Sequence, residues 1–207
     1  MIVRALMLEE SRLVTASPYE SLEIALKKIE DNNFLSIPVV EGRTFLGIIS
    51  KQKIYEEYFK GDYPDKESYI ENATVRGIYR NIIPKVDPND LVENASKVLE
   101  TFGIPFVAVV NNRGEFEGIV THHAIFHAFS ELFGLNEGHR IAVIAYDVPG
   151  QLAKLTDIIT KLGGDIISFT VVDPEVKLDV KEIVIRLRII NIDKLTQVLR
   201  ESGFKIQ

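Results

Sequence analysis

The sequence contains no cysteine, and this absence excludes disulfide bonds and metal sites that are built on thiolates. It also lacks long apolar runs, since those it has, such as residues 141–145, are far too short to cross a bilayer. Positive charge is not in excess either, because 24 Lys and Arg residues face 30 Asp and Glu residues and leave a net charge of −6. Binding to nucleic acid needs a basic stripe, so we expect neither nucleic acid nor a membrane among the partners.

Signatures of catalysis are missing as well. The chain has no cysteine nucleophile, no Gly-x-Ser-x-Gly elbow and no Walker-type phosphate loop, and its many carboxylates form no recognisable acid–base pair. The first residues do not show the basic, apolar and small-residue order of a secretory signal. We therefore predict a cytoplasmic protein that is not an enzyme and requires no cofactor.

What the chain does have is an internal repeat, with its two copies about 70 residues apart. Residues 3–7 open a segment that closes on Gly-Ile-Ile-Ser at 47–50, and residues 75–79 open a second that closes on Gly-Ile-Val-Thr at 118–121. Two copies are too few for a solenoid, so we predict a pseudo-symmetric pair with a cleft between its halves. The copies are placed at residues 1–60 and 75–135, with a polar linker at 61–74.

Each copy has the pattern of a strand, a helix, two strands and a helix. In the first copy, Ser17 is expected to cap a helix whose first position is Pro18. The predicted elements are a strand at 13–15, a helix at 19–32, strands at 35–40 and 44–50, and a helix at 51–59. The second copy repeats the order, with Asp87-Pro88 opening a helix at 90–102, strands at 106–110 and 116–121, and a helix at 122–133.

The pattern changes after residues 134–138, a glycine-containing segment that we predict to be a domain boundary. The domain at 139–207 is expected to contain a strand at 140–146, a helix at 149–162, strands at 165–172 and 182–190, a helix at 193–202 and a short strand at 204–206. A hairpin connection is expected at 173–181. This βαββαβ order is the split-βαβ arrangement with a four-stranded antiparallel sheet.

The repeated part resembles a tandem pair of CBS domains, the cystathionine-β-synthase type. The resemblance covers residues 1–135 and rests on the two glycine motifs, each of which leads into a helix, and on the Ser-Pro and Asp-Pro helix starts. The tail resembles an ACT domain through Asp-Val-Pro-Gly-Gln-Leu at 147–152 and through its βαββαβ order. The combination resembles AcuB-type regulatory proteins, named for acetoin utilisation. The implied fold is α+β, with pseudo-two-fold βαββα repeats followed by a ferredoxin-like ACT domain.

The resemblance implies regulation by small ligands. CBS pairs typically bind adenosine nucleotides in clefts between the copies, ACT domains typically bind amino acids where two ACT domains meet, and both usually work as homodimers. In the family, an Asp three residues after the strand-end Ser or Thr holds the ribose, but here these positions are Lys53 and Ala124. The expected nucleotide-binding residues are Thr15, Ala16, Ile37, Pro38, Val39, Ser50, Lys51, Lys53, Lys85, Thr121 and His122.

These residues have different expected roles. Ser50 and Thr121 mark junctions between a strand and a helix, where free N–H groups favour phosphate. The lysines would add positive charge, the residues at 37–39 would form an apolar wall, and those at 15–16 would offer backbone groups to the base. The resemblance makes AMP and ATP candidate ligands. Replacing the Asp by Lys removes a ribose acceptor and adds positive charge, which suits a ligand richer in phosphate and makes cyclic di-AMP a further candidate. In the simpler alternative, Ser50 and Thr121 only cap helices and Lys53 is a solvated helix lysine.

In the tail, Pro149 suits the first turn of a helix and Gly150 lets a ligand approach the backbone. The helix N-terminus would receive the carboxylate of an amino acid, and Asp147 and Asp165 would hold its ammonium group. The expected amino-acid-binding residues are Asp147, Pro149, Gly150, Gln151, Leu152 and Asp165. In the alternative, Asp147 only caps the helix and the tail is a dimerisation module.

His123 and His127 are four residues apart, but we predict roles in packing or at helix ends and no metal site. Two functional hypotheses therefore remain. In the first, the chain is a homodimeric sensor whose ligand state is read by an unidentified effector protein. In the second, it is a scaffold or assembly module with vestigial pockets.

Overall fold

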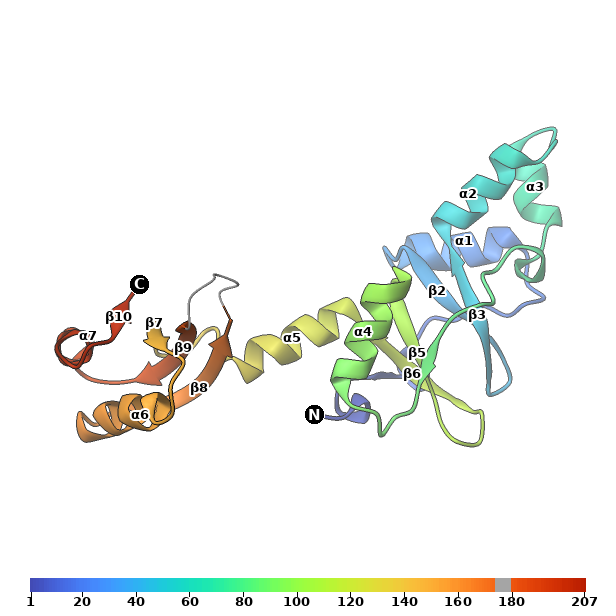
Figure 1. The fold of residues 1–207 in the computed structure, drawn as a ribbon. Helices are drawn as coiled ribbons and strands as arrows, with labels where there is room; N and C mark the ends of the chain where they lie inside the picture. The colour runs from blue at the N-terminus through green and yellow to red at the C-terminus, as the bar shows by residue number, and fades with distance from the viewer. Residues whose placement is uncertain (174–179) are drawn as a thin grey trace. The chain divides into compact units, whose positions relative to one another are not determined.

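The structure is a computed structural model that describes residues 1–173 and 180–207 (Figure 1). The chain forms two compact units, Met1–Phe126 and His127–Gln207, and the division falls inside helix α5 (His122–Leu132). The domain boundary that we expect at residues 134–138 stays a prediction. Within the described ranges, no helix is both long and apolar enough to cross a membrane.

The first copy contains a hairpin of strands β2 (Ser36–Glu41) and β3 (Thr44–Ser50), together with helices α1 (Leu22–Asp31) and α2 (Lys51–Lys60). The predicted helix start at Ser17-Pro18 is wrong. Ser21 caps α1 by accepting a hydrogen bond from Ile24 N, whereas the Ser17 hydroxyl accepts one from Tyr19 N in the preceding turn. The predicted strand at 13–15 is also absent, and in its place Ala16 forms an isolated bridge with Val39.

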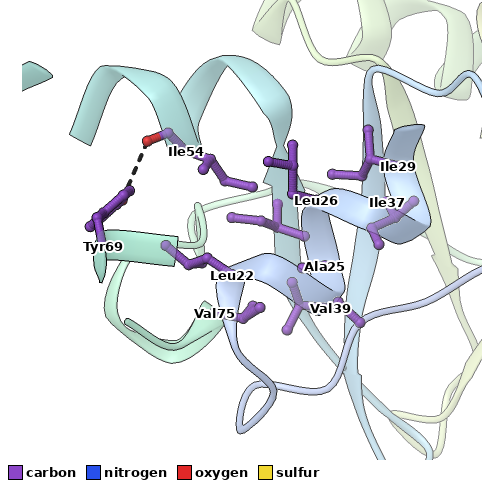
Figure 2. Close-up of a cluster of buried hydrophobic side chains, with 11 residues drawn as sticks. Leu22, Ala25, Leu26, Ile29, Ile37, Val39, Ile54, Tyr69 and Val75 are labelled. Carbon is purple, nitrogen blue, oxygen red and sulfur yellow. Dashed lines mark hydrogen bonds between the residues drawn. The ribbon is translucent and has the colours of Figure 1, made fainter. Parts of the chain in front are cut away.

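The core of this copy is built on one face of α1. Leu22, Ala25, Leu26 and Ile29 recur at helical spacing and pack with side chains from the hairpin and from α2, as Figure 2 shows. The predicted linker at 61–74 is not a plain linker, because it contains helix α3 (Lys66–Asn72). Tyr69 of α3 is only 2% exposed and belongs to the same core. Because most residues around Tyr69 are polar, the sequence pattern did not predict that this side chain is buried.

The second copy contains β4 (Lys85–Val86), α4 (Val92–Phe102), β5 (Phe106–Val110), β6 (Phe116–Thr121) and the start of α5. Its strands join β1 (Leu8–Glu9) in a sheet of order β1-β6-β5-β4. The predicted bounds of β3, β5 and β6 are confirmed. Both hairpins have a β-bulge, at Val39/Val40 in the first copy and at Val109/Val110 in the second, so the repeat extends to this irregularity.

The opening segments of the two copies are exchanged. Residues 3–9, here called leader 1, begin with η1 (Val3–Ala5) and provide β1, which pairs with β6 of the second copy. Residues 75–80, leader 2, begin with η3 (Val75–Gly77). Leader 2 returns to the first copy, where Arg80 N donates to Ile48 O at 2.9 Å and Ile48 N donates to Arg80 O at 3.0 Å. Each leader therefore completes the sheet of the other copy.

The glycine repeated in both strand-end motifs is explained by this exchange. A Cβ atom placed on Gly47 would lie 2.1 Å from Arg80 O, and one placed on Gly118 would lie 2.1 Å from Leu8 O. Both contacts are with backbone atoms, which cannot turn aside as a flexible side chain can. Only glycine therefore lets the leaders approach this closely.

The second unit is formed by β7 (His139–Tyr146), α6 (Gln151–Lys161), β8 (Asp165–Val172), β9 (Val180–Arg188), α7 (Ile192–Glu201) and β10 (Lys205–Ile206). Its four strands pair antiparallel in the order β10-β7-β9-β8. Leu155, Ile159, Leu195 and Leu199 from the two helices pack with side chains of β7 and β9 in one core. The element order matches the prediction, and most of the hairpin connection expected at 173–181 lies outside the described residues.

The close approach of the leaders leads to a mutational prediction. Gly47→Ala and Gly118→Ala should each lower the free energy of unfolding by about 1–3 kcal/mol, because the backbone must shift to admit the new methyl group. The midpoint of urea unfolding measures this effect. Gly77→Ala is the matched control, since a Cβ atom there meets nothing within 4 Å. Equal midpoints for Gly47→Ala and Gly77→Ala would show that the leader contact is not tight.

Burial of the Tyr69 phenol predicts a dependence of stability on alkaline pH. Burial raises the pKa of Tyr69 to about 12, above the value near 10 that the unfolded chain has. Because the folded-state pKa is the higher one, the protonated phenol of Tyr69 contributes to the free energy of unfolding. This contribution is complete below pH 10 and is lost as the pH rises towards 12. Over this range, the free energy of unfolding of the wild-type protein should fall by about 1–3 kcal/mol more than that of Tyr69→Phe.

Urea unfolding of the two proteins at pH 8 and at pH 11.5 measures the difference. Tyr69→Phe also removes the hydrogen bond from the Tyr69 hydroxyl to Ile54 O, 3.3 Å long, but that loss is already present at pH 8 (Figure 2). Parallel stability curves for the two proteins between these pH values would contradict the prediction.

Candidate functional site

The first unit has a cavity of about 1130 Å³ between the two copies. Its walls come from the β3–α2 junction and α2 of the first copy, from leader 2, and from the segment ahead of β5 in the second copy. Four of the predicted nucleotide-binding residues line it, namely Ser50, Lys51, Lys53 and His122. The other lining residues are Leu35, Ser36, Ile48, Gln52, Tyr55, Glu56, Glu57, Gly77, Ile78, Tyr79, Arg80, Gly103, Ile104 and Pro105. A space of this size can hold a nucleotide.

Most of the backbone N–H groups at the N-terminus of α2 are already bonded to acceptors of the protein. The Ser50 hydroxyl accepts a hydrogen bond from Lys53 N at 3.0 Å, and Lys51 N donates to Leu35 O at 3.0 Å. Two of the first three N–H groups of the helix are therefore already bonded. Thr121 acts in the same way on α5, where its hydroxyl accepts from Ala124 N at 3.2 Å. Both side chains cap helices, which is the simpler role that the sequence allowed.

The two lysines at this junction are paired with carboxylates. Lys51 Nζ lies 2.6 Å from Glu30 Oε1, and Lys53 Nζ lies 2.7 Å from Glu57 Oε1. The hydrogen bond from Lys51 lowers the pKa of Glu30, and the bond to Glu30 raises the pKa of Lys51. In the same way, the hydrogen bond from Lys53 lowers the pKa of Glu57. An incoming phosphate would therefore compete with these carboxylates for both lysines.

Several predicted residues lie elsewhere. Ala16, Ile37 and Val39 are each 1% exposed or less and belong to the core of the first copy. The backbone of Ala16 is already bonded on both sides, since its N–H donates to Pro38 O and its carbonyl accepts from Val40 N. The expected apolar wall at Ile37 and Val39 and the expected base contact at Ala16 are therefore corrected. Pro38, between them in β2, is also buried and does not line the cavity. Because side chains alternate along β2, Ile37 and Val39 share the face that packs into the core.

The remaining predicted residues are also outside the lining of the cavity. Thr15 O accepts a hydrogen bond from Lys28 Nζ at 3.0 Å. Lys85 Nζ lies over the Phe45 ring, 5.6 Å from its centroid. Apolar surface reaches the cavity instead from residues that the sequence did not single out, which are Leu35, Ile48, Ile78, Tyr79, Ile104 and Pro105. Leader 2 was missed because the repeat, followed in sequence order, assigns it to the second copy.

The second unit has its own cavity of about 390 Å³ at the β7–α6 turn. Five predicted residues line it, namely Asp147, Pro149, Gly150, Gln151 and Leu152, together with Ala145, Tyr146, Val148, Val171, Lys181 and Ile183. The N-cap of α6 is Gly150, at a φ of 90°, and this residue has no side chain with which to cap the helix. Asp147 therefore does not have the capping role of the alternative, and its carboxylate lies 3.5 Å from Lys181 Nζ. The hydrogen bond to Asp173 raises the pKa of Lys181, and the nearby Asp147 raises it further by a smaller amount.

Asp165 does not line this cavity, and its role in binding an amino acid stays a prediction. It opens β8 and pairs with Arg188, with 3.2 Å between Oδ2 and Nη1. Val171 lines the cavity six residues further along the same strand, a distance of about 20 Å in an extended chain. Asp165 was expected from the resemblance to ACT domains, and it lies at the opposite end of β8 from Val171.

Among the described residues, no three His, Asp or Glu side chains come close enough together to hold a metal ion. His122 Nε2 lies 3.0 Å from Ile104 O and so joins α5 to the segment ahead of β5.

In a comparison with known protein families, the model described as the CBS domain matches residues 3–60 and 75–131. Inosine-5'-monophosphate dehydrogenase from Korarchaeum cryptofilum (strain OPF8) is 25% identical over 158 residues, which are 71% of this chain and 30% of that protein. The chain thus spans about 30% of the length of this curated relative.

Solved structures share the fold of the first unit. A CBS domain-containing protein of unknown function from Bacillus anthracis is 26% identical, with a TM-score of 0.56 over 63% of this chain and 93% of that one. CBSX2, a CBS-pair protein from Arabidopsis thaliana solved in complex with AMP, is 20% identical, with a TM-score of 0.52 over 62% of this chain and 95% of that one. A CBS domain pair in complex with 5'-methylthioadenosine and S-adenosylmethionine is 20% identical, with a TM-score of 0.51 over 62% and 99%.

Proposed function

Because this chain belongs to the CBS domain family and has two such domains in tandem, we propose that it is a non-catalytic regulatory protein that binds an adenine nucleotide. The observation that carries the proposal is the cavity of about 1130 Å³ between the two copies. The structural neighbours with AMP, or with methylthioadenosine and S-adenosylmethionine, have folds like that of the first unit, and they indicate the class of ligand to test.

The lining of the cavity suits the parts of a nucleotide. Ile78, Tyr79 and Ile104 offer apolar and aromatic surface on which a base can stack. Glu56 and Glu57 line the cavity from α2, one helical turn beyond Lys53, and can accept hydrogen bonds from ribose hydroxyls. They would replace the carboxylate that the family has at position 53. AMP, ATP and cyclic di-AMP remain the candidate ligands.

We predict that a panel of AMP, ADP, ATP, cyclic di-AMP and S-adenosylmethionine contains a ligand that raises the melting temperature of the full chain. A ligand at 100 times its dissociation constant stabilises the folded state by about 2.7 kcal/mol, which a thermal-shift measurement detects easily. Lys53→Asp restores the family carboxylate and should strengthen AMP binding. Lys60→Asp is the matched control, because Lys60 is on the same helix and also faces Glu57, at 3.9 Å, but does not line the cavity.

A scaffold with vestigial pockets is the alternative, and the ion pairs Lys51–Glu30 and Lys53–Glu57 favour it. In that case the panel stays flat, calorimetry shows no binding, and Lys53→Asp gains no affinity over Lys60→Asp. The chain would then act through protein contacts alone.

For the second unit we propose an ACT-type domain at residues 139–207, which would make the chain an AcuB-type regulator with CBS copies at 1–60 and 75–135. Its βαββαβ order, its strand order β10-β7-β9-β8 and its cavity at the β7–α6 turn support this proposal. The domain would join two chains into a homodimer and bind an amino acid at residues 147–152. A cytoplasmic effector protein would then read the ligand state.

This proposal predicts that the full chain is a dimer by light scattering and that an amino acid shifts its melting temperature. Asp147→Asn should abolish that shift, because it removes the negative charge that would attract a ligand ammonium group. Asp157→Asn, an exposed change within α6 that lies outside the cavity, is the control. A dimer that responds to no amino acid would limit the second unit to assembly, and a monomer would contradict both roles.

A further inference from the structure

Charge is distributed unevenly around the cavity of the first unit. The lining contains three cations, Lys51, Lys53 and Arg80, and two carboxylates, Glu56 and Glu57. As described above, each lysine is paired with a carboxylate less than 3 Å away. Arg80 differs from both lysines, since no carboxylate of residues 1–173 or 180–207 lies within 4 Å of its guanidinium group.

The α2 side of the cavity is unfavourable for an anion. Lys51 N and Lys53 N at the start of the helix are already bonded, and Glu56 and Glu57 bring negative charge to the same wall. The negative charge of Glu56 and Glu57 repels a phosphate group, so a phosphate group would be directed away from α2. The leader 2 side carries Arg80 and no carboxylate among the lining residues.

Arg80 is also well suited to bind phosphate. Its backbone is fixed by the two hydrogen bonds to Ile48, and its carbonyl rests against Gly47. A guanidinium group that extends from a fixed backbone loses less freedom on binding, and its planar set of donors matches two phosphate oxygens at once. Arg80 is exposed, so water occupies these donors until a ligand replaces it.

The two halves of the pseudo-symmetric pair differ at this position. Leu8 is the counterpart of Arg80 in leader 1, because Leu8 O lies against Gly118 as Arg80 O lies against Gly47. An apolar side chain thus occupies the place that a cation occupies in the other half. The asymmetry gives a bound ligand one preferred orientation.

We propose that Arg80 is the anion-binding residue of the cavity and makes it selective for adenine ligands that carry a phosphate. The phosphate lies against leader 2, and the ribose hydroxyls face Glu56 and Glu57. Adenosine and methylthioadenosine, which have no phosphate, are disfavoured. This inference rests on the proposed function, and it names the ligand class and the residue that selects it.

Calorimetric titration of the full chain with AMP and with adenosine tests the proposal, because the two ligands differ only in the phosphate. The wild-type protein should bind AMP at least about tenfold more tightly than adenosine, as expected for a charge-assisted hydrogen bond. Arg80→Gln should weaken AMP binding by about tenfold or more and leave adenosine binding within about twofold. Arg80→Lys keeps the charge without the paired donors and should lie between the two.

Arg76→Gln is the matched control, since Arg76 is in the same leader, stacks on the Tyr19 ring and does not line the cavity. It should leave the affinities for AMP and adenosine unchanged. Equal binding of AMP and adenosine by the wild type, or AMP binding that Arg80→Gln leaves intact, would overturn the role of Arg80 while the nucleotide-binding function stands. A wild type that binds neither compound, nor any adenine nucleotide, would overturn both.

Discussion

The exchange of the two leaders is the constraint on which the first unit depends. Each copy gives its opening segment to the other, and each exchange places a backbone carbonyl where the partner strand can have no side chain. The glycine motifs that make the repeat visible in the sequence therefore record a contact between the copies and not a feature of either copy alone. The hairpins are joined on a second side by Phe45 and Phe116, whose rings stack at 5.4 Å, and by the ion pair between Arg43 and Glu115.

The cavity is a consequence of the same exchange. Leader 2 brings Ile78, Tyr79 and Arg80 to a wall that the first copy otherwise forms with β3 and α2. The second copy closes the space with Ile104 and Pro105, and the Ile104 carbonyl lies within hydrogen-bond distance of His122. The candidate ligand site therefore exists only when both copies are folded and exchanged. Its charge pattern follows from which residue each leader carries at one position, Leu8 or Arg80.

Much of the fold could be predicted from the sequence because the strands have strong local signals. The bounds of β3, β5, β6 and β8 agree with the periodicity of apolar residues. The start of α1 was predicted wrongly, because Ser17-Pro18 has the pattern of a helix start but the helix is capped by Ser21, which forms a bridge with Thr74. The candidate site was predicted least well. Lys51 and Lys53 could be predicted to lie at the site, but their pairing with Glu30 and Glu57 depends on the folded geometry. Arg80 left no local signal because its place at the cavity depends on leader 2 crossing to the first copy.

The exchange also means that the two copies cannot respond separately. A movement of leader 2 at the cavity pulls directly on β3, the central hairpin strand of the first copy, although leader 2 belongs to the second copy by sequence. Removal of either copy would remove the leader that pairs with the sheet of the other copy. The strand around Gly47 or Gly118 would then be exposed. The two copies are therefore coupled through this backbone pairing. A single small molecule that contacts leader 2 in the cavity would act on both copies at once.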